Sequence, residues 1–272
     1  MINKIKILIF QLFSQIRLNK EEINGNLKYF SLLKFNASYS MNLPFSIGRT
    51  VRGVKFDSEL DIYSNVVKGI ISGKDSEQLI NFLHNNYKNF ESKKVSEVNN
   101  FIHNKKLKNY PCWALILPWE KNEINTIKQR YLSSFYINRS QNGMKFKNKK
   151  FEEIESKIYS FETAMSHIIQ FSNLLKKIKI KGYINNYNDL PTVFIFVKGK
   201  KWIWMMSSSG NHRAHIMSEL NSKYIKCKIA GIIKYSELDN TPNVLNKTFT
   251  ENEAKCFFDK VFKGENPIRG PI

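Results

Sequence analysis

Apolar residues recur at helical spacing along several stretches of the chain. Residues 60–71 and 78–90 have the pattern of amphipathic helices, and residues 151–182 give the longest such pattern, which ends at a glycine. The apolar run over 110–120 is bounded by prolines, which is typical of a buried strand. The chain before residue 190 is therefore predicted to be largely helical.

The pattern then changes to that of strands. β-Branched and aromatic residues fill 192–197 and 202–206, and the Gly-Lys pair between them predicts a tight turn, so the two runs form a hairpin. A short helix over 211–220 and an isoleucine-rich strand over 224–233 follow. Taken together, the elements predict a mixed α+β fold.

The junction between the hairpin and the short helix is a candidate phosphate site. Ser209 and Gly210 form a small-residue turn, and Asn211, His212 and Arg213 open the helix. The first amides of a helix have no acceptor within the helix and lie at the positive end of its dipole. Gly210 lets a ligand approach the backbone, and Arg213 adds a planar fork of donors suited to phosphate.

The order of these elements, together with Gly210-Asn211-His212-Arg213, resembles the ParB/sulfiredoxin-like domain family over residues 151–235. The resemblance implies that the Gly-x-x-Arg segment holds nucleotide phosphates. Members of that family include chromosome-partition CTPases, sulfiredoxin, free-serine kinases and proteins labelled as nucleases. The C-terminal tail, 239–265, also looks like uncharacterised relatives found with surface-polysaccharide genes.

Two departures from the family narrow its implications. Sulfiredoxin needs a cysteine directly before His-Arg, where this chain has Asn211, so its thiol chemistry is not expected. Active kinases of the family carry an aspartate before the glycine, where this chain has Ser209, which cannot hold Mg²⁺ as a carboxylate does. Too few residues follow the last strand for the DNA-reading and dimerisation regions of a partition protein.

Length and composition set the domain organisation that we expect. The 272 residues are 42% hydrophobic and 13% aromatic, enough for one large or two modest globular domains. We predict a basic amphipathic segment over 1–24, an α/β region over 25–150, and the ParB/sulfiredoxin-like domain with a helical extension over 151–272. Three widely separated cysteines fit a reducing cytoplasm and show no metal-ligand spacing.

The charge suggests contact with a polyanion. The chain has 43 basic and 23 acidic residues and a net charge of +20, which suits nucleic acid or anionic lipid, although an AT-rich genome also produces Lys-rich and Asn-rich proteins. Residues 1–20 form an apolar helical face flanked by basic residues and contain no acid. This segment either lies on an anionic membrane, making the protein peripheral on the inner face, or docks on the protein's own core.

Other residues are candidates for supporting roles. Arg49 and Arg52 could supply a second anion contact, with an ordinary surface loop as the alternative. Glu155 and Glu162 are candidates for the general base that phosphoryl transfer requires. His212 and His215 share a helical face, but no third ligand at suitable spacing supports a metal site, so none is predicted.

Three functions are compatible with these features. The first is an ATP-dependent or other nucleotide-dependent kinase, which would use Mg²⁺ and act on a small molecule such as a sugar or glycan precursor. The second is a nucleic-acid-binding or nuclease-like protein that uses the same site for backbone phosphate. The third is a nucleotide-gated binding module without turnover.

Overall fold

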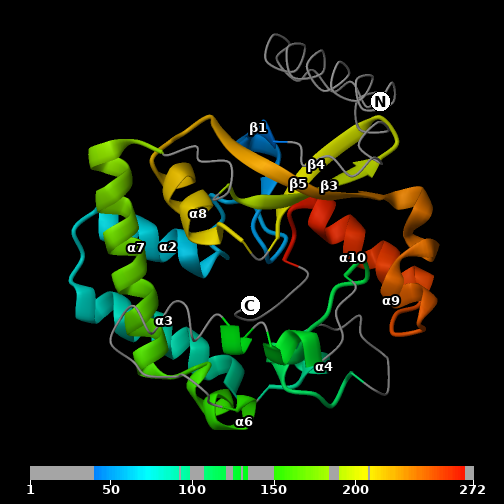
Figure 1. Cartoon of the computed structure of the whole chain (residues 1–272), viewed down its shortest axis with the longest axis horizontal. Helices are drawn as coiled ribbons and strands as arrows, with labels where there is room; N and C mark the ends of the chain where they lie inside the picture. The colour runs from blue at the N-terminus through cyan, green and yellow to red at the C-terminus, as the bar shows by residue number, and fades with distance from the viewer. Residues whose placement is uncertain are drawn as a thin grey trace, which may run out of the picture.

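The computed structural model describes residues 40–91, 93–98, 107–120, 125–129, 131–133, 150–183, 190–207 and 209–266. Its architecture is a mixed α+β fold, as the sequence pattern predicts, built around one curled sheet (Figure 1). The basic N-terminal segment 1–24, with its predicted membrane face over 1–20, lies outside these residues. None of the helices in the described part of the chain combines the length and the apolar character that crossing a bilayer requires.

Five strands form the sheet in the order β1-β5-β3-β4-β2. They are β1 (Ser40–Pro44), β2 (Gly48–Arg49), β3 (Thr192–Lys198), β4 (Lys201–Met206) and β5 (Tyr224–Lys234). β1 and β5 are antiparallel, as are β3 and β4, whereas β3 with β5 and β2 with β4 are parallel. The predicted hairpin and the predicted last strand are confirmed. Both the segment before residue 50 and the segment after residue 190 contribute strands to the same sheet.

The two faces of the sheet are covered by different elements. Side chains alternate along each strand, so Ile195 belongs to one face and Phe196 to the other. One face packs on α8 (Asn211–Glu219) and on the loop that contains Phe56. The opposite face packs on α10 (Glu251–Lys263), which follows η6 (Tyr235–Asn240) and α9 (Pro242–Leu245). The predicted short helix is thereby placed between the sheet and the remaining helices (Figure 1).

A helical layer with its own apolar cluster lies beyond α8 (Figure 1). The main helices are α2 (Ile62–Ile71), α3 (Ser76–Glu91) and α7 (Phe161–Lys181), of which the first two match the predicted ones closely. The shorter elements are η2 (Phe45–Ile47), α4 (Val95–Val98), η3 (Cys112–Ala114), α6 (Phe151–Ile154) and η4 (Glu155–Lys157). Contacts of α2 with α8, and of α8 with α7, connect this layer to the sheet.

Two sequence predictions need correction. The long helix over 151–182 is interrupted, because the Ser160 hydroxyl accepts a hydrogen bond from the Thr163 amide and caps a separate helix, α7. The run over 110–120 is not a strand: it contains the turn η3 and a single bridge between Lys94 and Pro111. Its apolar residues are buried against helices and, at Leu117 and Trp119, against the sheet, and burial alone does not distinguish a strand from an irregular segment.

Candidate anion-binding site

The turn before α8 is fixed by its glycine. Gly210 has φ of +82°, in the left-handed region, and a Cβ atom built there would lie 2.5 Å from the Pro191 Cβ. Only glycine fits both the conformation and the space. The helix then begins at Asn211 with no side-chain cap on its first amides, as expected for this junction.

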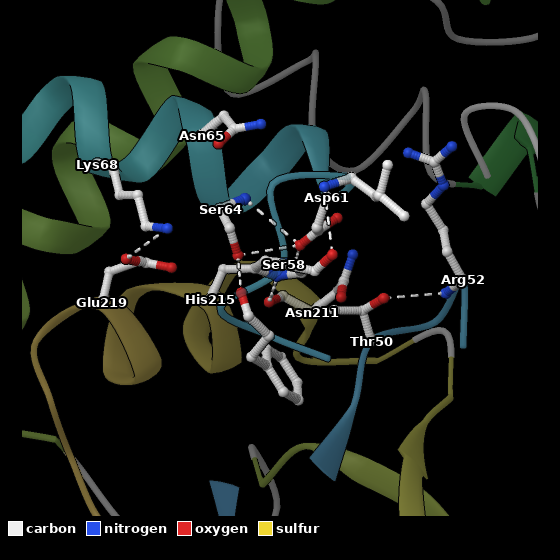
Figure 2. A network of polar contacts seen from close by, with 12 residues as sticks. Thr50, Arg52, Ser58, Asp61, Ser64, Asn65, Lys68, Asn211, His215 and Glu219 are labelled. Carbon is white, nitrogen blue, oxygen red and sulfur yellow. Dashed lines mark hydrogen bonds and ion pairs between the residues drawn. The ribbon is translucent and has the colours of Figure 1, made fainter. Parts of the chain in front are cut away.

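A buried ion pair joins the starts of two helices at this point. Asp61 is the N-cap of α2, and its Oδ2 accepts from the Ser64 amide at 3.4 Å. The same oxygen lies 2.6 Å from Nε2 of His215, in the second turn of α8 (Figure 2). Both side chains are 1% exposed. The pair therefore holds the first turn of α2 against α8, although the two residues are 154 positions apart.

The geometry makes His215 a cation. Its Nε2 faces the Asp61 carboxylate, and its Nδ1 lies 2.7 Å from the main-chain oxygen of Asn211. Neither partner can donate, so both ring nitrogens must carry a proton. Burial lowers the pKa of His215, but attraction to Asp61 and the hydrogen bonds outweigh burial and raise the pKa overall. Burial likewise raises the pKa of Asp61, and attraction to His215 more than reverses that effect, so its pKa is lowered.

A second buried cation lies beside this pair. Arg52 is 8% exposed, and its Nε has no hydrogen-bond partner among the described residues. Burial lowers the pKa of its guanidinium, whereas Asp61, Tyr63 and Tyr87 oppose that effect electrostatically. An arginine remains charged even so. In the described part of the chain, no carboxylate lies within ion-pair distance of Arg52, and Asp61 is already occupied by His215.

These residues line one small cavity. Its walls are the loop over 50–52, the first turn of α2, the first residue of α8 and a side chain from α3. The lining residues are Thr50, Val51, Arg52, Asp61, Ile62, Tyr63, Tyr87, Asn211 and His215. About 310 Å³ of space free of atoms lies at the cavity, most of it open solvent at the mouth, and the enclosed part has room for about one water molecule. Figure 2 shows Asp61, Asn211 and the Thr50–Arg52 segment around the same space.

The charge count in this cavity favours an anion. The cavity lining contains two cations, Arg52 and His215, and one carboxylate, Asp61, and the α8 N-terminus adds further positive potential. A buried charge without a partner costs several kcal/mol. An anion beside Arg52 would remove that cost and would also meet donors at the start of α8.

The predicted phosphate-binding residues occupy different sides of the α8 start. Asn211 lines the cavity. The ring of His212 packs on Phe171, with ring centroids 4.5 Å apart, and its Nε2 has no hydrogen-bond partner among the described residues. Burial lowers the pKa of His212 to about 4, so this ring is neutral at pH 7. Arg213 lies near Cys227 of β5. Burial raises the pKa of the Cys227 thiol to about 12, and the charge of Arg213 opposes that effect. Ser209 is exposed at the turn.

Arg49 and Arg52 have different surroundings. The Arg49 side chain donates to main-chain oxygens of Val261 at 3.0 Å, Phe262 at 2.8 Å and Gly48 at 2.8 Å. Two of these oxygens belong to the last turn of α10, and that of Val261 also accepts a hydrogen bond from the Gly264 amide at 3.0 Å. Arg49 therefore connects β2 to α10, and only Arg52 of the predicted pair lies at the cavity.

The predicted general bases lie away from this cavity. Glu155, in η4, accepts a hydrogen bond from Trp113 Nε1 at 2.8 Å. Glu162 is exposed in the first turn of α7, where hydrogen bonds to its own amide and to Ser160 lower its pKa. Asp61 is the carboxylate that the structure brings to the cavity. The described residues contain no group of three His, Cys, Asp or Glu side chains placed to hold a metal ion.

Sequence reasoning missed Asp61, Tyr63 and Tyr87. Asp61 precedes a helix and has the ordinary signature of an N-cap. The tyrosines, whose hydroxyls lie 3.2 Å apart, occupy α2 and α3 among other apolar positions. The pair of histidines in the α8 motif was the one available signal in the sequence. A buried histidine needs a hydrogen-bond partner, which pointed to a polar residue such as Asp61 elsewhere in the chain.

The chain matches no known family model, and it shows no significant similarity to a curated protein or to a solved structure. What the site can do therefore follows from its own geometry and charge.

Proposed function

We propose that this protein binds the phosphate group of a nucleotide in the cavity between α2 and α8. The observation that carries the proposal is the buried Arg52 guanidinium, which has no carboxylate partner among the described residues and lines the same cavity as the uncapped start of α8. The resemblance of residues 151–235 to the ParB/sulfiredoxin-like family, in which the corresponding segment holds nucleotide phosphates, supports phosphate binding at the start of α8, although Arg213 of that segment lies on the β5 side and not at the cavity.

The finer proposal is an ATP-dependent kinase acting on a sugar or glycan precursor. Asp61 is the acidic residue nearest to a bound phosphate, but it is paired with an imidazolium and is therefore a weak base. A single carboxylate already engaged in an ion pair does not fit a dedicated Mg²⁺ site, so Mg²⁺ would enter only with the phosphates of its nucleotide. The alternative, a nucleotide-gated binding module without turnover, needs no general base and therefore places no such demand on Asp61.

A second candidate is nucleic-acid binding, which the net charge of +20 favours. In that case backbone phosphate would be bound mainly by surface lysines. The basic segment 1–20 keeps its proposed role as a contact to anionic membranes, and deletion of that segment followed by liposome sedimentation tests it.

Thermal unfolding tests the main proposal. ATP, ADP, CTP and GTP are each added with and without Mg²⁺ to the native protein, Arg52→Met and Arg213→Ala. At about a hundred times its Kd, a ligand that binds only the folded state adds about 2.7 kcal/mol, and we expect a rise in Tm of about 5 °C or more. The rise should disappear in Arg52→Met.

The variants also separate the two sides of the α8 start. Because Arg52 is buried and no described carboxylate pairs with it, the unliganded Arg52→Met protein should be at least as stable as the native one. If Arg213→Ala abolishes the rise and Arg52→Met does not, the phosphate lies on the β5 side of the helix. A Tm unaffected by every nucleotide contradicts nucleotide binding altogether.

A further inference from the structure

The cavity presents hydrogen-bond acceptors beside its cation. All the hydrogen bonds to the Asp61 carboxylate go to Oδ2, so Oδ1 has no partner among the described residues. The side-chain oxygen of Asn211, buried in the same cavity, has none either. Arg52, by contrast, can only donate. A ligand that supplies the missing hydrogen bonds must accept from Arg52 and donate to the Asp61 or Asn211 side-chain oxygen.

Fully ionised anions do not meet that requirement. Sulfate and an internal phosphodiester carry no proton at neutral pH, so their oxygens would face the Asp61 and Asn211 oxygens with lone pairs on both sides. Each acceptor left buried without a donor costs about 1–3 kcal/mol. A phosphate monoester has a second pKa of about 6, and its singly protonated form carries one P–OH group as well as charged oxygens.

We propose that the cavity selects a terminal phosphate group in its singly protonated form, with Arg52 donating to the charged oxygens and either Asp61 or Asn211 accepting from the single P–OH group. This inference rests on the proposed phosphate binding and specifies its ligand class. It separates terminal phosphates, as in ATP or a sugar phosphate, from the internal diesters of nucleic acid.

The size of the cavity adds a second element of selectivity. The enclosed part of the cavity has room for about one water molecule, and most of the 310 Å³ is open solvent at its mouth. A phosphate group would therefore bind from the mouth, after the lining side chains move apart, and the rest of a nucleotide would lie outside. The site would therefore contact the phosphate and not the nucleobase, so ATP, CTP and GTP should bind with similar affinity.

The affinity should also depend on pH. Among the described residues, the charged and titratable groups of the cavity wall are Arg52, Asp61, His215 and the Tyr63 and Tyr87 hydroxyls. Further from the ligand, His167 contacts the two tyrosine hydroxyls, and His212, Glu219 and Lys68 lie near His215. The singly protonated phosphate is lost as the pH rises above about 6. Deprotonation of His215 at higher pH removes a cation and acts in the same direction.

Titration calorimetry on the full chain tests the proposal in 0.3 M NaCl, which screens diffuse charge. The probes at pH 6 are inorganic phosphate, methyl phosphate, dimethyl phosphate and sulfate. We expect the first two to bind, and the last two to bind at least tenfold more weakly, which corresponds to about 1.4 kcal/mol. Methyl phosphate, which loses its only P–OH proton over this range, should bind about tenfold more weakly at pH 8 than at pH 6.

Variants identify the groups responsible. Asn211→Ala and Asp61→Asn each remove an acceptor, so we expect sulfate to gain affinity relative to phosphate; Asn211→Ala keeps the ion pair with His215 and serves if Asp61→Asn does not fold. Asn173→Ala, an exposed change on α7, is the control. Equal binding of sulfate and phosphate to the native protein overturns the selectivity but leaves the anion site standing. If no probe binds, the proposed function fails as well.

Discussion

At the scale of single residues, His212 makes the folded protein sensitive to acid. Its pKa is lowered by burial from 6.5 to about 4, so the unfolded chain binds more protons between these values. Stability contributed by the neutral ring is complete above pH 6.5 and is lost as the pH falls towards 4, by about 3 kcal/mol in all. In His212→Phe, the free energy of unfolding measured in urea should not show this loss between pH 6.5 and pH 4. The same change at His84, a partly exposed residue of α3, is the control and should leave the pH dependence as it is.

Arg49 carries a structural role that its sequence position conceals. Its guanidinium satisfies carbonyl groups at the end of α10 and one in β2. We expect Arg49→Met to destabilise the protein by about 3 kcal/mol, because each hydrogen bond from a charged group contributes about 1.5–3 kcal/mol and water replaces part of the loss. Chemical denaturation measures this value. Arg49→Met with native stability would mean that the α10 carbonyls are solvated without Arg49.

At the scale of elements, the start of α8 depends on one glycine. Gly210→Ala combines a left-handed backbone with a contact of 2.5 Å to Pro191, whereas Gly199→Ala, in the β3–β4 turn, has the backbone cost but nothing within 4 Å of the added Cβ. We expect the change at Gly199 to cost about 1 kcal/mol and the change at Gly210 at least about 2 kcal/mol more. Equal losses of Tm in the two variants would show that Pro191 gives way easily, and the turn would then not be rigid.

The ion pair between Asp61 and His215 also acts at this scale, since it connects α2 to α8. The raised pKa of His215 adds stability that is present below its unfolded value and lost as the pH rises through the folded value. The lowered pKa of Asp61 adds stability that is lost as the pH falls through its folded value. The two helix starts are therefore held most firmly between these limits.

At the scale of the whole molecule, the net charge of +20 creates an attraction for polyanions that is separate from the cavity. Binding of duplex DNA through diffuse charge should weaken steeply with salt, with a slope near −0.9 per phosphate neutralised. We expect filter retention of DNA to be unchanged in Arg52→Met and to vanish at high salt, while methyl phosphate binding to the native protein persists there. Loss of DNA retention in Arg52→Met would place nucleic acid in the cavity.

The sequence by itself determined the elements whose signals are local. Strand-type residues around a Gly-Lys turn predicted β3 and β4, and a small-residue turn before a helix predicted the start of α8 at Asn211. Periodicity located α2 and α3 but missed the capping serine at Ser160 that separates α6 from α7.

Only the tertiary structure decided which charges meet. Asp61 pairs with His215 across 154 positions, and Arg49 reaches α10 across 212, so neither contact leaves a trace in local spacing. Arg49 and Arg52 looked alike in sequence, yet Arg49 donates to the end of α10, whereas Arg52 lines the cavity and its Nε has no partner in the described part of the chain. Side-chain partners are set by how elements pack, because electrostatic and hydrogen-bond energies depend on distance in space and on burial, and not on distance along the chain.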